Sequence, residues 1–192
     1  MVALAADLFA QKGYRATTVR DIAKAAGILS GSLYHHFDSK ESIGDEILSN
    51  FMNAVLADYR AAVASAGSPR AVLEQIVRST SRTLSRHRAA LAMLQSDWTY
   101  FSTQPRFAYL PKTLREIEQT WVTQLELGQE SGAFRADLDP RLTYRLIRDV
   151  LWIPAQWRRT GGFTTSQVVD GFLRLLFDGI TSPAGDVAAG SA

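Results

Sequence analysis

The side chains best suited to bind or react lie together in one short stretch of this 192-residue chain, SGSLYHHF at 30–37. Its polar side chains are two hydroxyls, one phenol and two adjacent imidazoles: Ser30, Ser32, Tyr34, His35 and His36. Imidazoles can bind a metal, transfer a proton or contact a phosphate, and hydroxyls can contact phosphates or base edges. The stretch is therefore a candidate for metal binding, for acid–base catalysis or for nucleic-acid recognition.

Metal binding is not expected at the histidine pair. Neighbouring residues on a helix point about 100° apart, so His35 and His36 cannot easily share one ion. His87 is the only other histidine, and the chain has no cysteine, which excludes disulfides and thiolate zinc sites. The sequence therefore predicts no metal and no cofactor.

Catalysis is not expected either. The sequence contains no G-x-S-x-G, no phosphate-binding loop and no dinucleotide fingerprint. Carboxylates such as Asp97, Glu116 and Glu118 are scattered over helical segments, where they normally form a solvated face. We expect a protein that is not an enzyme, and a helical enzyme acting on acyl thioesters is the weaker alternative.

The segments around the stretch have the pattern of a helix-turn-helix. Thr18 is expected to cap a short helix that ends at Gly27, and a second short helix covers about 30–36. Two short helices joined around a glycine are typical of a helix-turn-helix, whose second helix enters a DNA major groove. A purely structural helical hairpin fits the period and capping equally well. The positions expected to face the groove are Ser30, Gly31, Ser32, Tyr34, His35 and His36.

The distribution of charge matters more than its total. The net charge is only +2, so a nucleic-acid interface must depend on where the cations lie. Five of them surround the helix pair and can neutralise backbone phosphates: Lys12, Arg15, Arg20, Lys24 and Lys40.

Nearly every segment has the helical period and none alternates with period two, so the chain is predicted to be all-α. The expected helices cover about 2–12, 18–26, 30–36, 39–63, 70–87, 89–101, 108–131, 140–159 and 165–179. The first pattern is already under way at Met1, so we expect further residues before it. We predict a DNA-binding domain at 1–45, a ligand-binding and dimerisation domain at 46–182 and a disordered tail at 183–192. No apolar run approaches the roughly 20 residues that span a bilayer, and a cytoplasmic location is expected.

The helix expected at 140–159 is apolar on two faces. One stripe consists of Leu142, Leu146, Val150, Ile153 and Trp157, and the other of Tyr144, Arg148, Leu151, Trp152 and Ala155. Arg145 and Asp149 are four apart and can pair, which leaves Arg148 without a carboxylate in its own stripe. A cation among aromatic residues needs an acid on another helix or an anionic ligand, and both remain open. Aromatic residues that could line the same pocket, or simply belong to the core, are Trp98, Phe101, Tyr109 and Trp121.

The last expected helix is too apolar for the surface of a monomer, which predicts a homodimer. A two-fold axis would also present two recognition helices to palindromic half-sites about 34–36 Å apart. The residues predicted to form the dimer are Trp157, Val169, Phe172, Leu173, Leu176 and Phe177.

The run ATTVRDIAKAAGILSGSLYHHFDSKESI at 16–43 resembles the signature of the TetR family of dimeric transcriptional repressors, with Tyr34, Phe37 and Lys40 at its most typical positions. The resemblance implies phosphate contacts from Thr18, Tyr34, His35 and Lys40, base contacts near 30–32, and a dimer built from the last two long helices. The family usually has serine where this chain has Leu29, so Ser30 is expected to take over the cap of the recognition helix.

Within that family, AGILSGSLYHHF, QPRFAY, ESGAFRADLD, YRLIRDVLW and GGFTTSQV are similar to segments of the KstR-type repressors of the later, ring-fragment stage of cholesterol catabolism. This implies release from double-stranded operator DNA by a coenzyme A thioester of a steroid-ring fragment, with Arg148, Trp152 and Arg106 as candidates to hold its pyrophosphate. The alternatives are another hydrophobic or fatty acyl-CoA effector, or a helical interaction module that binds no DNA.

Overall fold

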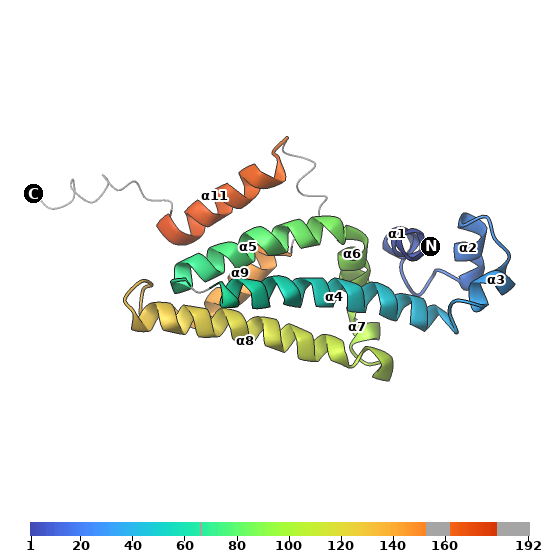
Figure 1. The fold of residues 1–192 in the computed structure, drawn as a ribbon, viewed down its shortest axis with the longest axis horizontal. Helices are drawn as coiled ribbons and strands as arrows, with labels where there is room; N and C mark the ends of the chain where they lie inside the picture. The colour runs from blue at the N-terminus through green and yellow to red at the C-terminus, as the bar shows by residue number, and fades with distance from the viewer. Residues whose placement is uncertain (66, 153–161, 180–192) are drawn as a thin grey trace, which may run out of the picture. The chain divides into compact units, whose positions relative to one another are not determined.

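The computed structural model describes residues 1–65, 67–152 and 162–179, and these residues form helices and no β-strand (Figure 1). The prediction of an all-α protein is confirmed. The elements are α1 (Val2–Lys12), α2 (Val19–Ala25), α3 (Ser30–Tyr34), α4 (Lys40–Ala64), α5 (Pro69–Arg86), α6 (Arg88–Ser96), α7 (Trp98–Phe101), the 3₁₀ turn η1 (Pro105–Phe107), α8 (Tyr109–Glu130), α9 (Pro140–Leu151) and α11 (Thr165–Asp178). No helix in these ranges is long and apolar enough to cross a membrane.

Contacts divide the chain into two units, residues 1–155 and 156–192. In the first unit the long helix α4 packs against α1, α5, α6 and α8 (Figure 1). The three short N-terminal helices gather at the amino-terminal end of α4, while α5 and α8 flank the rest of its length. The predicted domain boundary at 45/46 falls inside α4, so both predicted domains share this helix.

Side-chain caps explain where the helices next to the turn begin. The Thr18 hydroxyl accepts a hydrogen bond from the Asp21 backbone N–H, and the Asp21 carboxylate accepts one from the Thr18 backbone N–H. Ser39 and Ser42 form the same reciprocal pair at the start of α4. Each pair satisfies two N–H groups that the helix itself leaves free, and so fixes the start of the helix.

The helix expected at 89–101 is broken into α6 and α7 at Asp97, which corrects the sequence prediction. One Asp97 carboxylate oxygen accepts hydrogen bonds from the Tyr14 backbone N–H at 3.0 Å and from the Ser96 hydroxyl at 2.9 Å. The backbone of Asp97 leaves the helical region, with φ −118° and ψ 24°. A contact with a residue 83 positions earlier accompanies the break in the apolar period.

The helix expected at 140–159 ends at Leu151, eight residues early, with Trp152 as its C-cap. Pro154, which has no backbone N–H to continue a helical ladder, follows three residues after Leu151 in the sequence. Ile153, Pro154 and Trp157 lie outside the described residues, and so does the predicted tail at 183–192.

An aromatic cluster around Tyr14 forms the core where α1, α4 and α7 meet. Tyr14 is fully buried, and its ring centroid lies 4.8 Å from those of Phe9 and Phe101. Gly44 of α4 lies against the same ring, because a Cβ atom built there would come within 2.9 Å of Tyr14 Cε2. Glycine at this position therefore lets α4 approach Tyr14 closely.

We expect Gly44→Ala to destabilise the protein by about 1–3 kcal/mol, because the buried Tyr14 ring has little room to move away from a new methyl group. Gly171→Ala is the matched control, since Gly171 also lies in a helix and a Cβ atom there meets nothing within 4 Å. Urea denaturation gives the free energy of unfolding of both variants. A loss in Gly44→Ala no larger than in Gly171→Ala would contradict the close packing.

Candidate nucleic-acid interface

The short helix α3 is anchored by one buried side chain and exposes most of the others. Leu33 is 1% exposed, whereas Tyr34 is 55% exposed. Ser30 is half-buried, and Gly31, Ser32, His35 and His36 are exposed. The positions predicted to face the groove are thus mostly accessible from outside the protein.

Ser30 does not cap α3, contrary to the sequence expectation. The N-cap is Leu29, whose apolar side chain makes no capping hydrogen bond, and Ser30 is the first helical residue. The Ser32 backbone N–H donates to the Leu29 carbonyl at 3.0 Å, so a backbone turn starts the helix. The Ser30 hydroxyl therefore has no role as the cap of α3.

Thr18 and Arg20 lie at the start of α2. The Thr18 hydroxyl donates to an Asp21 carboxylate oxygen at 2.6 Å, and these bonds from Thr18 hold the pKa of Asp21 below its ordinary value. Because the folded pKa is depressed, this contribution to stability is present at neutral pH and is lost as the pH falls through the folded pKa. Arg20 is exposed, and Lys12 lies 3.9 Å from the Asp21 carboxylate.

Lys40 binds the protein's own backbone. Its ammonium donates to the carbonyl oxygens of Tyr14, Arg15 and Thr17 at 3.0, 3.3 and 3.1 Å. It also lies 4.7 Å from the centroid of the Tyr14 ring, a cation–π contact. Lys40 thus holds the segment between α1 and α2 against the start of α4, and its phosphate contact stays a prediction.

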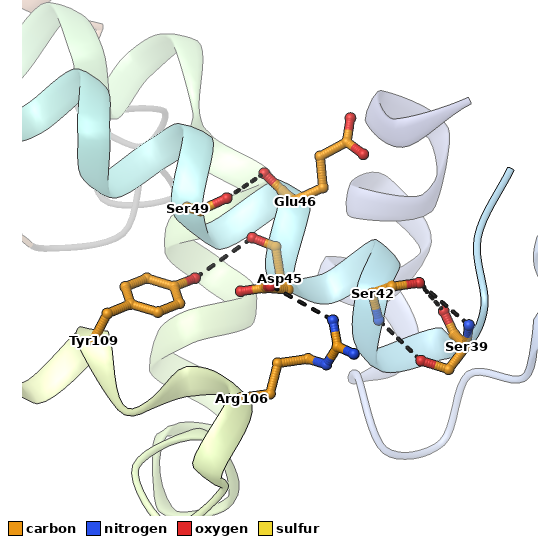
Figure 2. A network of polar contacts seen from close by, with 7 residues as sticks. All are labelled: Ser39, Ser42, Asp45, Glu46, Ser49, Arg106 and Tyr109. Atoms are coloured by element: carbon orange, nitrogen blue, oxygen red, sulfur yellow. Dashed lines mark hydrogen bonds and ion pairs between the residues drawn. The ribbon is translucent and has the colours of Figure 1, made fainter.

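Asp45 of α4 joins the same end of the helix to the start of α8 (Figure 2). The Arg106 guanidinium lies 3.7 Å from the Asp45 carboxylate, and the Tyr109 hydroxyl donates to the Asp45 carbonyl oxygen at 3.4 Å. Burial, together with the neighbouring Asp45 carboxylate, raises the pKa of Tyr109 above its ordinary value. Two residues predicted to bind the effector therefore have structural partners.

The other residues predicted to bind the effector do not form one cluster. Phe101 is buried against Tyr14, and Trp98 is 36% exposed at the start of α7. Trp121 is buried, and its indole N–H donates to the Tyr59 hydroxyl at 2.9 Å. Trp152 lies elsewhere, with its ring centroid 6.1 Å from that of Phe51 and its carbonyl bound by the Gln95 amide.

The Arg148 guanidinium pairs with the carboxylate of the next residue, Asp149. This corrects the expected pairing of Asp149 with Arg145. The guanidinium of Arg148 contacts Asp149 Oδ1 at 2.7 and 2.8 Å and lies 5.9 Å from the centroid of the Tyr144 ring. The Arg148 side chain is 41% exposed and that of Asp149 69%. The ion pair therefore faces solvent beside an aromatic ring.

A half-open cleft of about 550 Å³ was not anticipated from the sequence. It lies between α1, α4 and the junction of α5 with α6, and its lining includes Ala6, Ile47, Asn50 and His87. Burial and the adjacent Arg86 lower the pKa of His87. Nothing in the sequence around Arg86, His87 and Arg88 indicated a cleft, because its walls come from helices far apart in the chain. Within the described ranges, no group of three or more acidic or histidine side chains could hold a metal ion.

In the second unit, α11 begins with a capping box between Thr164 and Gln167. Of the residues predicted to form the dimer, Val169 and Leu173 are buried, and Phe172, Leu176 and Phe177 are partly exposed. Their role in dimerisation stays a prediction.

We expect Lys40→Met to lower the free energy of unfolding by about 1–3 kcal/mol, because three carbonyl oxygens lose a charged donor while the aliphatic stem is largely kept. Lys24→Met is the control, since Lys24 is an exposed lysine in the same region. Urea denaturation of both variants tests this, and equal stabilities would show that the Lys40 contacts contribute nothing.

Two family models together cover most of the chain. The model of bacterial regulatory proteins of the tetR family matches residues 2–47, and that of the tetracyclin repressor-like C-terminal domain matches residues 66–180. The first match contains α1, α2 and α3 and the start of α4. The helix-turn-helix described above therefore coincides with the DNA-binding part of a known regulator family.

Relatives named as repressors match over about nine-tenths of their length. The HTH-type transcriptional repressor KstR2 of Rhodococcus jostii is 45% identical over 181 residues, which cover 94% of this chain and 89% of that one. KstR2 of Mycobacterium tuberculosis is 43% identical over 182 residues, which cover 94% and 91%. The structure of that ketosteroid transcriptional regulator matches with a TM-score of 0.88 over 94% of this chain and 93% of that one, at 43% identity.

These relatives are named as transcriptional repressors and not as enzymes, in agreement with the prediction that the chain is not an enzyme. The resemblance seen at 16–43 is confirmed by the family model and by the relatives. The chain belongs to the TetR family of bacterial transcriptional regulators.

Proposed function

We propose that this ligand-responsive repressor controls genes of steroid catabolism and leaves its operator when a coenzyme A thioester of a steroid-ring fragment binds. The observation that carries the proposal is the identity of 43–45% over 94% of the chain with KstR2 repressors, one of which is described as a ketosteroid transcriptional regulator. Such similarity over both parts of the chain favours a shared effector class as well as a shared fold.

The DNA contacts are assigned to α3 and its neighbours. Tyr34, His35 and His36 are exposed beside Ser32 and can donate to phosphates or base edges. Arg20 at the start of α2 adds a cation that faces solvent. Thr18 and Lys40, which already serve as a cap and as a backbone clamp, would fix the backbone that approaches the phosphates.

A homodimer would place two copies of α3 in successive major grooves. Leu142, Leu146 and Val150 recur every four residues along α9 and are 57%, 64% and 48% exposed. An apolar stripe of this kind on an otherwise folded surface favours burial against a partner. A second copy is the partner that a palindromic operator requires. The apolar face of α11 is assigned to the same dimer.

The effector contact is assigned first to Arg148 and Trp152. The Arg148–Asp149 pair is solvent-exposed, and exposed ion pairs contribute little to stability. Arg148 can therefore exchange Asp149 for an anionic group of the thioester at small cost, with the aromatic side chains of Tyr144 and Trp152 nearby along the helix. Arg106 is a second cation, held 3.7 Å from Asp45.

Release is a population shift between two dimer forms. The effector-binding part touches the DNA-binding helices through the Asp97–Tyr14 hydrogen bond, and its Arg106 contacts Asp45 near the start of α4. A ligand that favours a form in which these contacts are rearranged changes the spacing of the two α3 helices. Operator affinity then falls by the ratio of the ligand's affinities for the two dimer forms.

We expect Tyr34→Phe to weaken operator binding at least tenfold, because it removes a hydroxyl that donates to a phosphate. The melting temperature should not change, since the side chain is 55% exposed. Anisotropy of a labelled duplex from upstream of the protein's own coding sequence measures the affinity. Tyr144→Phe removes a hydroxyl from α9 and should bind like the wild type. Equal affinity of Tyr34→Phe and wild type would exclude the Tyr34 hydroxyl from the interface.

We expect Arg148→Ala to bind the operator normally but to need about tenfold more steroid-fragment thioester for half-release, because a charge-assisted contact is lost. Arg145→Ala is the matched control on the same helix, since Arg145 is exposed and the nearby Asp149 carboxylate pairs with Arg148 instead. The same titration with fatty acyl-CoA tests the alternative effector. Unchanged release in Arg148→Ala would leave Arg148 as the surface partner of Asp149 only.

A further inference from the structure

Leu29 is the most exposed of the large apolar side chains in the described part of the chain, at 79%. It immediately precedes α3, and its neighbours Gly31 and Ser32 are also exposed. Single exposed leucines are common, but this one occupies a position with a specific local requirement.

The start of α3 does not benefit from a leucine. An N-cap residue normally accepts a hydrogen bond through its side chain, and leucine ranks among the poorest residues for this role. Leu29 makes no such bond, and only its carbonyl takes part in the turn, accepting from the Ser32 N–H at 3.0 Å. Neither helix capping nor burial within the protein therefore accounts for the side chain.

A partner for Leu29 follows from its place in the helix-turn-helix. The amino-terminal residues of the second helix are the ones that meet base edges in the major groove. The apolar group that a base pair presents there is the C5 methyl of thymine. Ser30, Gly31 and Ser32 are small, so they do not hold the backbone away from the groove floor.

We propose that Leu29 packs on the 5-methyl group of one thymine in each operator half-site. This contact gives the protein a higher affinity for duplexes with thymine at that position. The proposal rests on the operator binding proposed above. It adds to the predicted contacts a residue that reads sequence through an apolar surface, whereas Tyr34, His35 and Arg20 contact phosphates or polar base edges. The expected preference is for thymine over cytosine, which lacks the 5-methyl group and carries an amino donor where thymine has its O4 acceptor.

The test uses deoxyuridine, which differs from thymidine only by the missing methyl group. A duplex is first selected by the wild-type protein from a random pool, and each thymine is then replaced by deoxyuridine symmetrically in both half-sites. For one position we expect the wild type to bind about fourfold more weakly per half-site, the effect of one methyl group no longer buried, and therefore about fifteenfold more weakly for the dimer. Leu29→Ala should bind the thymine and deoxyuridine duplexes equally well.

The control variant is Val63→Ala. Val63 is 45% exposed and lies at the other end of α4, about 35 Å along the helix axis from Lys40. When deoxyuridine replaces thymine, Val63→Ala should lose operator affinity at the same position and to the same extent as the wild type. Melting temperatures of Leu29→Ala and Val63→Ala should match that of the wild type, because both side chains are exposed.

Two results overturn the inference while leaving operator binding intact. One is a wild type that is insensitive to deoxyuridine at every position. The other is that Leu29→Ala loses affinity to the same extent as the wild type at every position where the wild type is sensitive. If the wild type enriches no duplex from the pool, operator binding itself fails, and the role of Leu29 fails with it.

Discussion

The arrangement of the N-terminal helices depends on the burial of Tyr14. Its ring fills the space between α1, α4 and α7, and its main chain is held from two sides, by Asp97 at the N–H and by Lys40 at the carbonyl. Gly44 allows α4 to touch the ring directly. Because these contacts come from residues in four different segments, the turn between α1 and α2 has one position relative to α4, and that position sets where α3 is presented.

The contacts around Tyr14 contribute to stability and also connect the DNA-binding helices to the part of the chain assigned to the effector. Asp97 ends α6, so the hydrogen bond that fixes Tyr14 also ties the DNA-binding helices to the part of the chain assigned to the effector. The Arg106 and Tyr109 contacts with Asp45 make a second tie along the same end of α4 (Figure 2). Arg106 and Tyr109, which the sequence predicts to bind the effector, therefore also hold the start of α8 against the amino-terminal end of α4.

Local signals predicted most of the helices and the location of the helix-turn-helix. The capping box at Thr18, the serine at the start of α4 and the glycine after α2 are short-range features, and each depends only on neighbouring residues. The break at Asp97 could not be predicted because its partner lies 83 positions away.

The pairing of Arg148 with Asp149 was missed for another reason. Adjacent residues do not face each other on a helix, but a long guanidinium side chain can still reach its neighbour. The backbone contacts of Lys40 were not predicted, because a lysine beside a helix-turn-helix looks the same in sequence whether it binds DNA or backbone carbonyls. Its phosphate contact stays a prediction.

The unbroken course of α4 has a mechanical consequence. Its 25 residues make a rod about 37 Å long that starts beside the recognition unit and ends between α5 and α8. A rod of this length that tilts by about 5° about one end moves its other end by about 3 Å, close to the rise of one base pair along DNA. Side-chain adjustments too small to disturb the packing around α5 and α8 can therefore be amplified into a mismatch with the spacing of the grooves.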